Sequence, residues 1–195
     1  VFQVGDGGTV FELDAFLAVN GFDLNGGSAG TSAQLSGQSL PTGLALGFSA
    51  ALSDPADAVL TYVFTNLSSG SFTNLRFSVL LDAEVDQEFN TFFNEFGTVI
   101  GTLGNGAGDV TPDMWQIDEP GFVSGALFNN LFLGALNNSN SVPASAPNDV
   151  ALGLGFLLGD LAPGQSAAVS VMISSAGHYL GTFALQQSDT ASNSP

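Results

Sequence analysis

Cysteine and lysine are absent from this chain of 195 residues, which contains one arginine, Arg76, and one histidine, His178. Without cysteine there is no disulfide, no thiolate metal ligand and no thiol nucleophile. Without lysine there is no isopeptide cross-link through a lysine amine. Any assembly of this protein must therefore be held by non-covalent contacts.

Positive charge is scarce as well, because one arginine stands against eighteen acids and the formal net charge is -17. Nucleic-acid binding neutralises phosphates with Lys and Arg, and anionic membranes attract polybasic segments. We therefore expect no nucleic-acid partner, and we expect cations to bind. Seventeen Phe residues distinguish the chain from an acidic disordered protein, which lacks aromatic residues.

Long hydrophobic runs are missing as well, since no apolar stretch approaches the roughly 20 residues that span a bilayer. We expect no membrane insertion of the mature chain. The sequence begins at Val1 and shows no signal peptide, which we interpret as a mature product whose leader has been removed. Its Gly, Ser, Thr and Asn content and its single tryptic site favour an extracellular or cell-surface location.

Short segments of alternating apolar and polar residues predict an all-β fold, an antiparallel β-sandwich of jelly-roll or Ig-like topology with at most one short helix. Turn residues after position 66 predict that strands 59–66 and 75–81 form a hairpin. Residues 127–136 fit either a short helix or a buried strand. The predicted strands are 9–19, 44–52, 59–66, 75–81, 150–158, 167–174 and 180–187.

The N-terminal strand is set apart by the Gly-, Ser-, Asn- and Gln-rich connection 20–43, which is flexible by composition. We therefore divide the chain into an N-terminal arm (1–43), a β-sandwich core (44–187) and a polar tail (188–195). The strand could fold back into its own sheet or complete a neighbour's sandwich by β-augmentation. Repeated head to tail, the second arrangement gives a homopolymeric filament. The predicted assembly face of the strand consists of Phe11, Leu13, Ala15, Leu17 and Val19.

The stretch 80–126 contains nine of the eighteen acids. Four of them alternate in 82–88, so an extended strand would place them on one face with neighbours about 6.5 to 7 Å apart. Calcium takes six to eight oxygen ligands, and Asn90, Asn94 and Glu95 add further oxygens. The alternative is a solvated polar face, and no EF-hand loop pattern is present. The predicted Ca²⁺ ligands are Asp82, Glu84, Asp86, Glu88, Asp109, Asp113, Asp118 and Glu119.

Asp118 and Glu119 stand before Pro120 and Gly121, so a strand is expected to deliver two acids to a rigid turn. Paired carboxylates near Trp115 would also suit a glycoside hydrolase. We expect no enzymatic activity and no catalytic residue, because small sandwiches more often bind sugars or ions than cleave them. A Ser-His-Asp site is not indicated either, since the sequence lacks G-x-S-x-G.

Three further features have modest predicted roles. Arg76 alternates with core residues and is expected to pair with an acid on a neighbouring strand. His178 lies in a Ser/Gly turn and is expected to be a lone surface or capping histidine rather than a zinc ligand. Asn66 and Asn137 begin N-x-[ST] sequences in predicted loops and are candidate glycosylation sites.

Five segments resemble the secreted bacterial proteins that carry a PEP-CTERM sorting signal and are processed by exosortase. They are YVFTN (62–66), NLRF (74–77), DAEVDQEFNTFFNEFG (82–97), WQIDEPGF (115–122) and SVPASAPNDVALGLGFLLGDL (141–161). The resemblance implies export, association with the cell surface or matrix, links to exopolysaccharide biofilms and no known enzyme activity. The sorting signal, membrane helix and basic tail are absent from the sequence, and we expect that processing removes them.

Two functions follow from these expectations. The first is a non-catalytic subunit of an extracellular filament or biofilm matrix, assembled by donation of the N-terminal strand and braced by calcium. The alternative is a calcium-dependent polysaccharide-binding module of the cell surface that uses Trp115, Phe92, Phe93 and Phe122.

Overall fold

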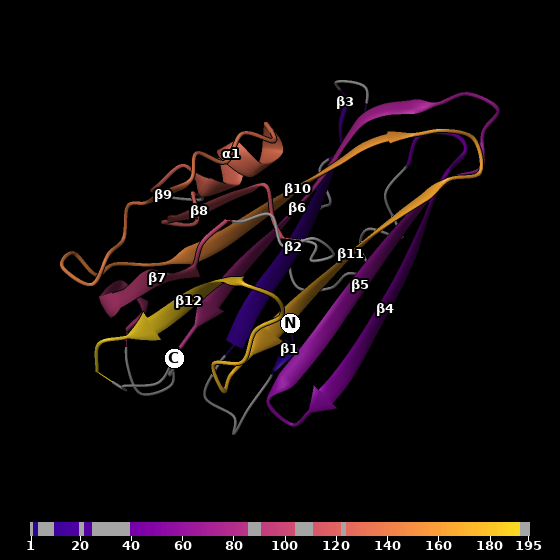
Figure 1. The fold of residues 1–195 in the computed structure, drawn as a ribbon. Helices are drawn as coiled ribbons and strands as arrows, with labels where there is room; N and C mark the ends of the chain where they lie inside the picture. The colour runs from indigo at the N-terminus through magenta and orange to yellow at the C-terminus, as the bar shows by residue number, and fades with distance from the viewer. Residues whose placement is uncertain are drawn as a thin grey trace.

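The structure, a computed structural model, describes residues 2–3, 10–19, 22–24, 40–85, 91–103, 111–121 and 124–191. Its largest sheet follows the order β1-β2-β6-β10-β8-β9, with β3 also paired to β2 (Figure 1). All pairings in this sheet are antiparallel except β8 with β9. The strands are β1 (Phe2–Gln3), β2 (Val10–Val19), β3 (Phe22–Leu24), β6 (Phe72–Glu84), β8 (Met114–Asp118), β9 (Ser139–Asn140) and β10 (Ala151–Leu161).

Two smaller antiparallel sheets form the second layer. One has the order β11-β5-β4 and the other pairs β12 with β7. These strands are β4 (Leu44–Asp54), β5 (Asp57–Asn66), β7 (Glu95–Gly101), β11 (Ser166–Ser174) and β12 (Phe183–Asp189). A 3-10 turn, η2 (Phe92–Asn94), precedes β7, and the helix α1 (Leu127–Phe132) follows β8.

The two small sheets cover one face of the large sheet. The main core joins the large sheet to β5, β4 and β11, and a smaller cluster joins it to β7 and β12. The opposite face of the large sheet is covered by α1, against which Phe16, Leu80 and Ala151 are buried. The predicted all-β sandwich with one short helix is therefore confirmed. No helix of the described part of the chain has the length and hydropathy that crossing a membrane requires.

The predicted hairpin between 59–66 and 75–81 is wrong, because β5 and β6 lie in different layers. β5 pairs with β4 and β11, whereas β6 pairs with β2 and β10. The two strands meet face to face, with the ring of Tyr62 at 4.6 Å and that of Phe64 at 5.3 Å from the ring of Phe77. Alternation predicts which side chains turn inward, but it does not distinguish a sheet neighbour from a partner across the core.

In the single chain, β2 folds back into the large sheet and does not stand apart from the core. It pairs with β6 from Val10 opposite Glu84 to Ala18 opposite Arg76. The predicted inward face is confirmed where it is described, because Leu13, Ala15 and Leu17 are buried in the main core. The side chains of Phe11 and Val19 lie outside the described ones. Phe16 is also buried, on the other face, where its ring meets that of Phe128 at 5.6 Å.

At the C-terminal end, β12 runs through Asp189, two residues into the stretch that was expected to be a polar tail. The strand continues because its last residues pair with the start of β7, where Asp189 lies opposite Glu95. A polar composition therefore did not mark the end of the folded region.

Candidate functional site

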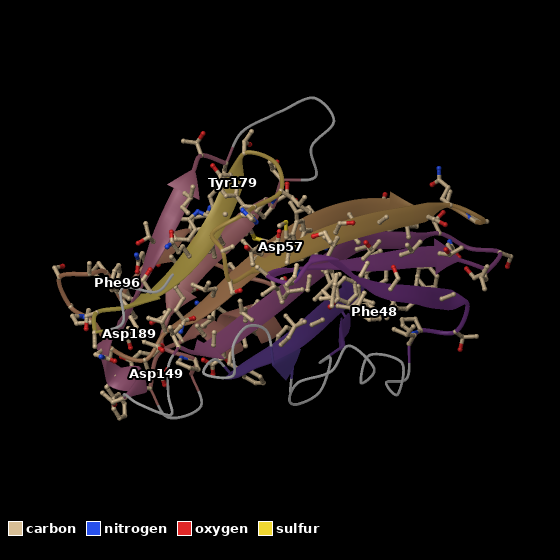
Figure 2. All side chains as sticks on the ribbon, turned by 90° about the horizontal axis from the view of Figure 1, so that it is seen from below. Phe48, Asp57, Phe96, Asp149, Tyr179 and Asp189 are labelled. Carbon is tan, nitrogen blue, oxygen red and sulfur yellow. The ribbon has the colours of Figure 1, made fainter. Side chains whose placement is uncertain are left out.

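Acidic side chains gather at the end of the sandwich where β7 begins and β8 ends. Asp82 on β6 lies opposite Ala151 on β10, and Ala151 lies opposite Asp118 on β8, so the two acids share one row of the large sheet. Figure 2 shows Asp149 and Asp189 at this end, far from Phe48. We define the acidic end as Asp82, Glu95, Asp118, Glu119, Asp149 and Asp189.

The carboxylate of Asp118 accepts hydrogen bonds that stabilise the turn after β8. Oδ1 accepts from the backbone N–H of Glu119 at 2.9 Å and from the hydroxyl of Ser141 at 2.6 Å. Oδ2 accepts from Nε2 of Gln116 at 2.9 Å and from the backbone N–H of Ala126 at 3.3 Å. A carboxylate offers about four acceptor positions. Asp118 therefore holds the turn together.

At the same end, the ionised carboxylate of Asp149 lies in an unfavourable electrostatic environment. Burial raises the pKa of the Asp149 carboxyl, the negative charge of Glu119 raises it further, and the backbone N–H of Val150 lowers it. The Glu119 carboxylate itself accepts a hydrogen bond from the hydroxyl of Ser124. Two acids that repel each other in a half-buried setting attract protons or cations. This pair is the clearest electrostatic reason for a cation to bind this end.

Glu95 is fully buried and connects β7 to β12 and to the turn after β6. Its Oε1 accepts from the backbone N–H of Val85 at 2.9 Å, and its Oε2 accepts from Nε2 of Gln187 at 2.6 Å. Its backbone exchanges hydrogen bonds with Asn148 in both directions. The buried Asp189 stands opposite Glu95 in the β12–β7 register. Because burying a carboxylate is costly without such donors, this end of the sandwich depends on polar contacts.

Three residues of the predicted calcium set lie at the same end of the sandwich. Asp82, Asp118 and Glu119 belong to the acidic end, whereas the exposed Asp113 precedes β8 and accepts from the backbone N–H of Leu157 at 2.6 Å. Among the described residues, no group of three or more His, Cys, Asp or Glu side chains is placed to hold one metal ion. Calcium binding therefore stays a prediction.

Only part of the predicted ladder of alternating acids lies within the described residues. β6 ends at Glu84, and Val85 lies in a turn, so within the described chain only Asp82 and Glu84 of the ladder belong to the strand. The side chain of Glu84 is not among those described. Asp86, Glu88 and Asp109 lie outside the described residues.

The two basic side chains lie in different places. The guanidinium of Arg76 donates to Oδ1 of Asn74 and to the backbone carbonyl of Gly134, both at 3.4 Å. Within the described part of the chain these contacts replace the expected ion pair with an acid. His178 is exposed at the surface, as expected, and its Nδ1 lies 2.9 Å from Oδ2 of the buried Asp57.

The prediction of a glycosylation site at Asn66 is wrong. Asn66 is fully buried as the last residue of β5, and its Nδ2 donates to the carbonyls of Gly70 at 2.7 Å and Leu161 at 2.8 Å. This amide nitrogen, to which a glycan would be attached, supports the crossing from β5 to β6 instead. Asn137 is exposed and stays a candidate.

The aromatic residues proposed for polysaccharide binding do not form one surface among the described residues. Trp115 packs towards the core, with its ring 6.3 Å from that of Phe183. Phe93 is 59% exposed on η2. The side chain of Phe92 and all of Phe122 lie outside what the structure describes.

Sequence reasoning missed the buried pair Glu95 and Asp189 and the link between Asp57 and His178. A signal for the first existed, because Gln187 and Asp189 continue the inward parity of Phe183 along β12. Polar residues on an inward face indicate a buried polar contact. No local pattern indicated that Asp57, 121 residues away from His178, would meet it.

Comparison of this chain with known protein families, with curated proteins and with solved structures found no match in any of the three.

Proposed function

We propose that this protein is a non-catalytic structural subunit of an extracellular filament or matrix, in which β2 is donated to a neighbouring subunit. The observation that carries the proposal is the position of β2. Over half of its length, 12–16, it pairs through β6 alone, because β1 and β3 cover its other edge at 10–11 and 17–19 in the described chain. The β2 strand of a second copy would restore the same pairs and the same core.

The chain after β3 gives β2 the reach to exchange. Fifteen residues, 25–39, separate β3 from the next described residue. Fully extended, fifteen residues span at most about 54 Å. A strand that leaves its own sheet and enters the next subunit makes a head-to-tail contact, which does not close and therefore gives a fibre.

A second feature supports self-association. Among the described residues, β4 is an edge strand of its sheet, eleven residues long, and it contains neither Pro nor Lys. Its Leu52 is 73% exposed. Natural proteins usually protect such an edge with charges, Pro or bulges. The only irregularity in the pairing of β4 with β5 lies at its end, between Leu52 and Asp54.

Calcium has a role in this proposal because every subunit has a formal charge of -17. Subunits with this charge repel one another, and divalent cations at the acidic end would reduce the repulsion. We therefore propose calcium as a brace of the assembled form. Electron microscopy of the secreted material should show fibres that are lost with EDTA and return with Ca²⁺. Fibres that persist in EDTA would contradict the role of calcium but not the proposed strand exchange.

A disulfide trap tests strand exchange, since the chain has no cysteine of its own. Ala15 and Val79 lie directly opposite in the β2–β6 register, and antiparallel neighbours at this spacing suit a disulfide. In the double variant A15C/V79C, fibres should contain disulfides between chains, seen as a ladder on a non-reducing gel. The dilute monomer should form the bond within one chain.

The single variants A15C and V79C are the matched controls, and each should give no ladder beyond dimers. Fibres of the double variant that contain only bonds within one chain would overturn the donation of β2. In that case the edge of β4, which is unpaired among the described residues, would be the next contact to test, by Leu52→Lys.

A further inference from the structure

The outer edge of β4 presents backbone groups that no strand of the described chain pairs with. From Leu44 to Leu52 the pairing of β4 with β5 is regular, without a bulge. The carbonyl of Gly43 accepts from the backbone N–H of Leu67 at 2.7 Å, so strand alternation makes the odd-numbered residues of β4 bond to β5. The even-numbered residues therefore turn their N–H and C=O groups to the outer edge.

The even-numbered side chains of β4 belong to the core face of the sheet, but they are not covered along its whole length. Leu44 is buried, and the ring of Phe48 lies 5.1 Å from that of Tyr62. Further along the same face, Ala50 is exposed and Leu52 is 73% exposed. The second half of the strand thus continues the apolar core face at the surface.

The sequence of β4 is self-complementary when one copy is reversed against another. LALGFSAAL (44–52) has Phe48 at its centre, with leucine at both ends and alanine inside each leucine. Two antiparallel copies related by a two-fold axis at Phe48 would place even-numbered residues opposite even-numbered ones, as their outward hydrogen-bonding groups require. The pairs would be Leu44 with Leu52, Ala45 with Ala51, Leu46 with Ala50, Gly47 with Ser49, and Phe48 with Phe48.

This sheet is also the uncharged part of a protein whose net charge is -17. β4 has no charged residue before Asp54, β5 has none after Asp57, and β11 has none. Figure 2 shows Phe48 far from Asp149 and Asp189. Two copies of an acidic protein repel where their acids meet, whereas a basic partner would gain from acids that this edge lacks. The charge distribution therefore favours a second copy at the edge of β4.

We propose that two copies of this protein pair β4 with β4, antiparallel and about a two-fold axis at Phe48. The β11-β5-β4 sheets of the two copies then form one continuous sheet. The exposed Leu52 of each copy lies beside Leu44 of the other, and the contact closes at two copies because it is isologous. It is independent of strand donation, since β2 belongs to the other layer, and it would join fibres side by side.

A cysteine pair on the outer face of β4 tests the register. In the two-fold pair, Ala45 lies opposite Ala51 of the second copy at a non-hydrogen-bonded position, where Cα atoms are about 4.5 Å apart and a disulfide fits. Within one chain the two positions are about 20 Å apart along the strand, so they cannot bond. Under mild oxidation A45C/A51C should give a dimer band on a non-reducing gel.

The single variants A45C and A51C are the matched controls and should remain monomeric on the gel. Dimers from either single variant would show another register. A ladder from A45C/A51C in place of a dimer band would show a contact that does not close. Either result would overturn the proposal, as would a dimer in solution that A45C/A51C does not capture.

Sedimentation equilibrium of the dilute protein provides the second arm and should show a reversible equilibrium between monomer and dimer. Ala50→Lys places a charge at the outer edge opposite Leu46 and should weaken the dimer by about tenfold or more. Ala168→Lys adds the same charge at an exposed position of β11 and should leave the dimer unchanged. A monomer at every concentration, or full dimerisation of folded Ala50→Lys, would overturn the proposal. Dimers formed by exchange of β2 would be insensitive to Ala50→Lys, so the two contacts are distinguished.

Discussion

The two halves of the sandwich, an aromatic half under β5 and an acidic half under β7 and β12, are stabilised by different interactions. Under β5, the rings of Phe48, Tyr62, Phe64, Phe77 and Phe156 form a chain with neighbouring centroids 4.6 to 6.2 Å apart. Under β7 and β12, the buried groups include Glu95, Gln187 and Asp189. Aromatic burial depends little on pH or ions, whereas buried carboxylates depend on their donors and on the surrounding charge. Solution conditions should therefore act first on the acidic end.

Removing a ring from the aromatic half should cause the largest loss. Phe77 is fully buried among three other rings, and Phe77→Ala should lower the free energy of unfolding by about 3 to 5 kcal/mol. Urea titrations with and without Ca²⁺ should give the same loss. Phe93→Ala, at an exposed ring, should change stability by less than about 0.5 kcal/mol. A loss at Phe77 that depends on Ca²⁺ would contradict the separation of the two halves.

A buried hydroxyl in the aromatic half, that of Tyr62, should reveal itself at high pH. Burial raises the pKa of Tyr62 to about 12, and its hydroxyl has no hydrogen-bond partner among the described residues. Because the folded pKa lies above the ordinary value of 10.0, the stability is intact below pH 10 and falls as the pH rises towards 12. The loss should reach about 2 to 3 kcal/mol.

Tyr62→Phe removes both effects. It should be about 1 kcal/mol more stable than the unmodified protein at neutral pH, because no hydroxyl is left buried without a partner. The difference between the two proteins should widen between pH 10 and 12, as measured by urea unfolding at each pH. Parallel curves for the two proteins would show that another group titrates there.

In the acidic half, the close approach of β7 to β8 depends on one glycine. A Cβ on Gly97 would collide with the side chain of Ile117. Gly97→Ala should therefore destabilise the protein by about 1 to 3 kcal/mol, and hydrogen exchange should show the loss in β7 and β12 before β5. Gly70→Ala, where a Cβ meets nothing within 4 Å, is the matched control. Equal exchange in both halves would indicate one cooperative unit.

The smallest effect is expected at Asp149, which is only half-buried and therefore screened by solvent. Its folded pKa is raised, so its charge destabilises the fold at neutral pH, and stability should increase as the pH falls towards 3.8. Asp149→Asn should be slightly more stable than the unmodified protein at pH 7 and equal to it below pH 3.8. Added Ca²⁺ should shrink the difference at pH 7. A variant that is less stable at pH 7 would contradict the repulsion with Glu119.

Much of the fold could be read from the sequence. Alternation predicted seven strands that the structure contains with ends shifted by up to three residues, and the residues around Pro55 and Pro163 were predicted turns. β7 was not predicted, because its sequence EFGTVIG begins with a buried acid and contains Gly97 at the close contact with β8. Local patterns describe a half-exposed strand well, and they fail where a polar residue turns inward.

The candidate site was predicted only in part. The acidic turn at Asp118 was recognised because Asp, Glu, Pro and Gly follow one another in the sequence. Its partner Ser141 depends on the parallel pairing of β8 with β9, and the proximity of Asp149 to Glu119 depends on the antiparallel pairing of β8 with β10. The aromatic residues suggested for sugar binding were equally ambiguous, since a Trp at a strand position can turn to solvent or to the core.

By itself, the sequence determined the class of the fold, the inward faces of most strands, the absence of covalent cross-links and the excess negative charge. These properties depend on composition and on neighbours along the chain. Only the tertiary structure decided that β5 and β6 face each other across the core, that Asn66 is buried, and that Glu95 meets Asp189. These three features depend on contacts between residues that are far apart in sequence. The period-2 alternation of a strand is the same whether its partner lies beside it in the sheet or across the core.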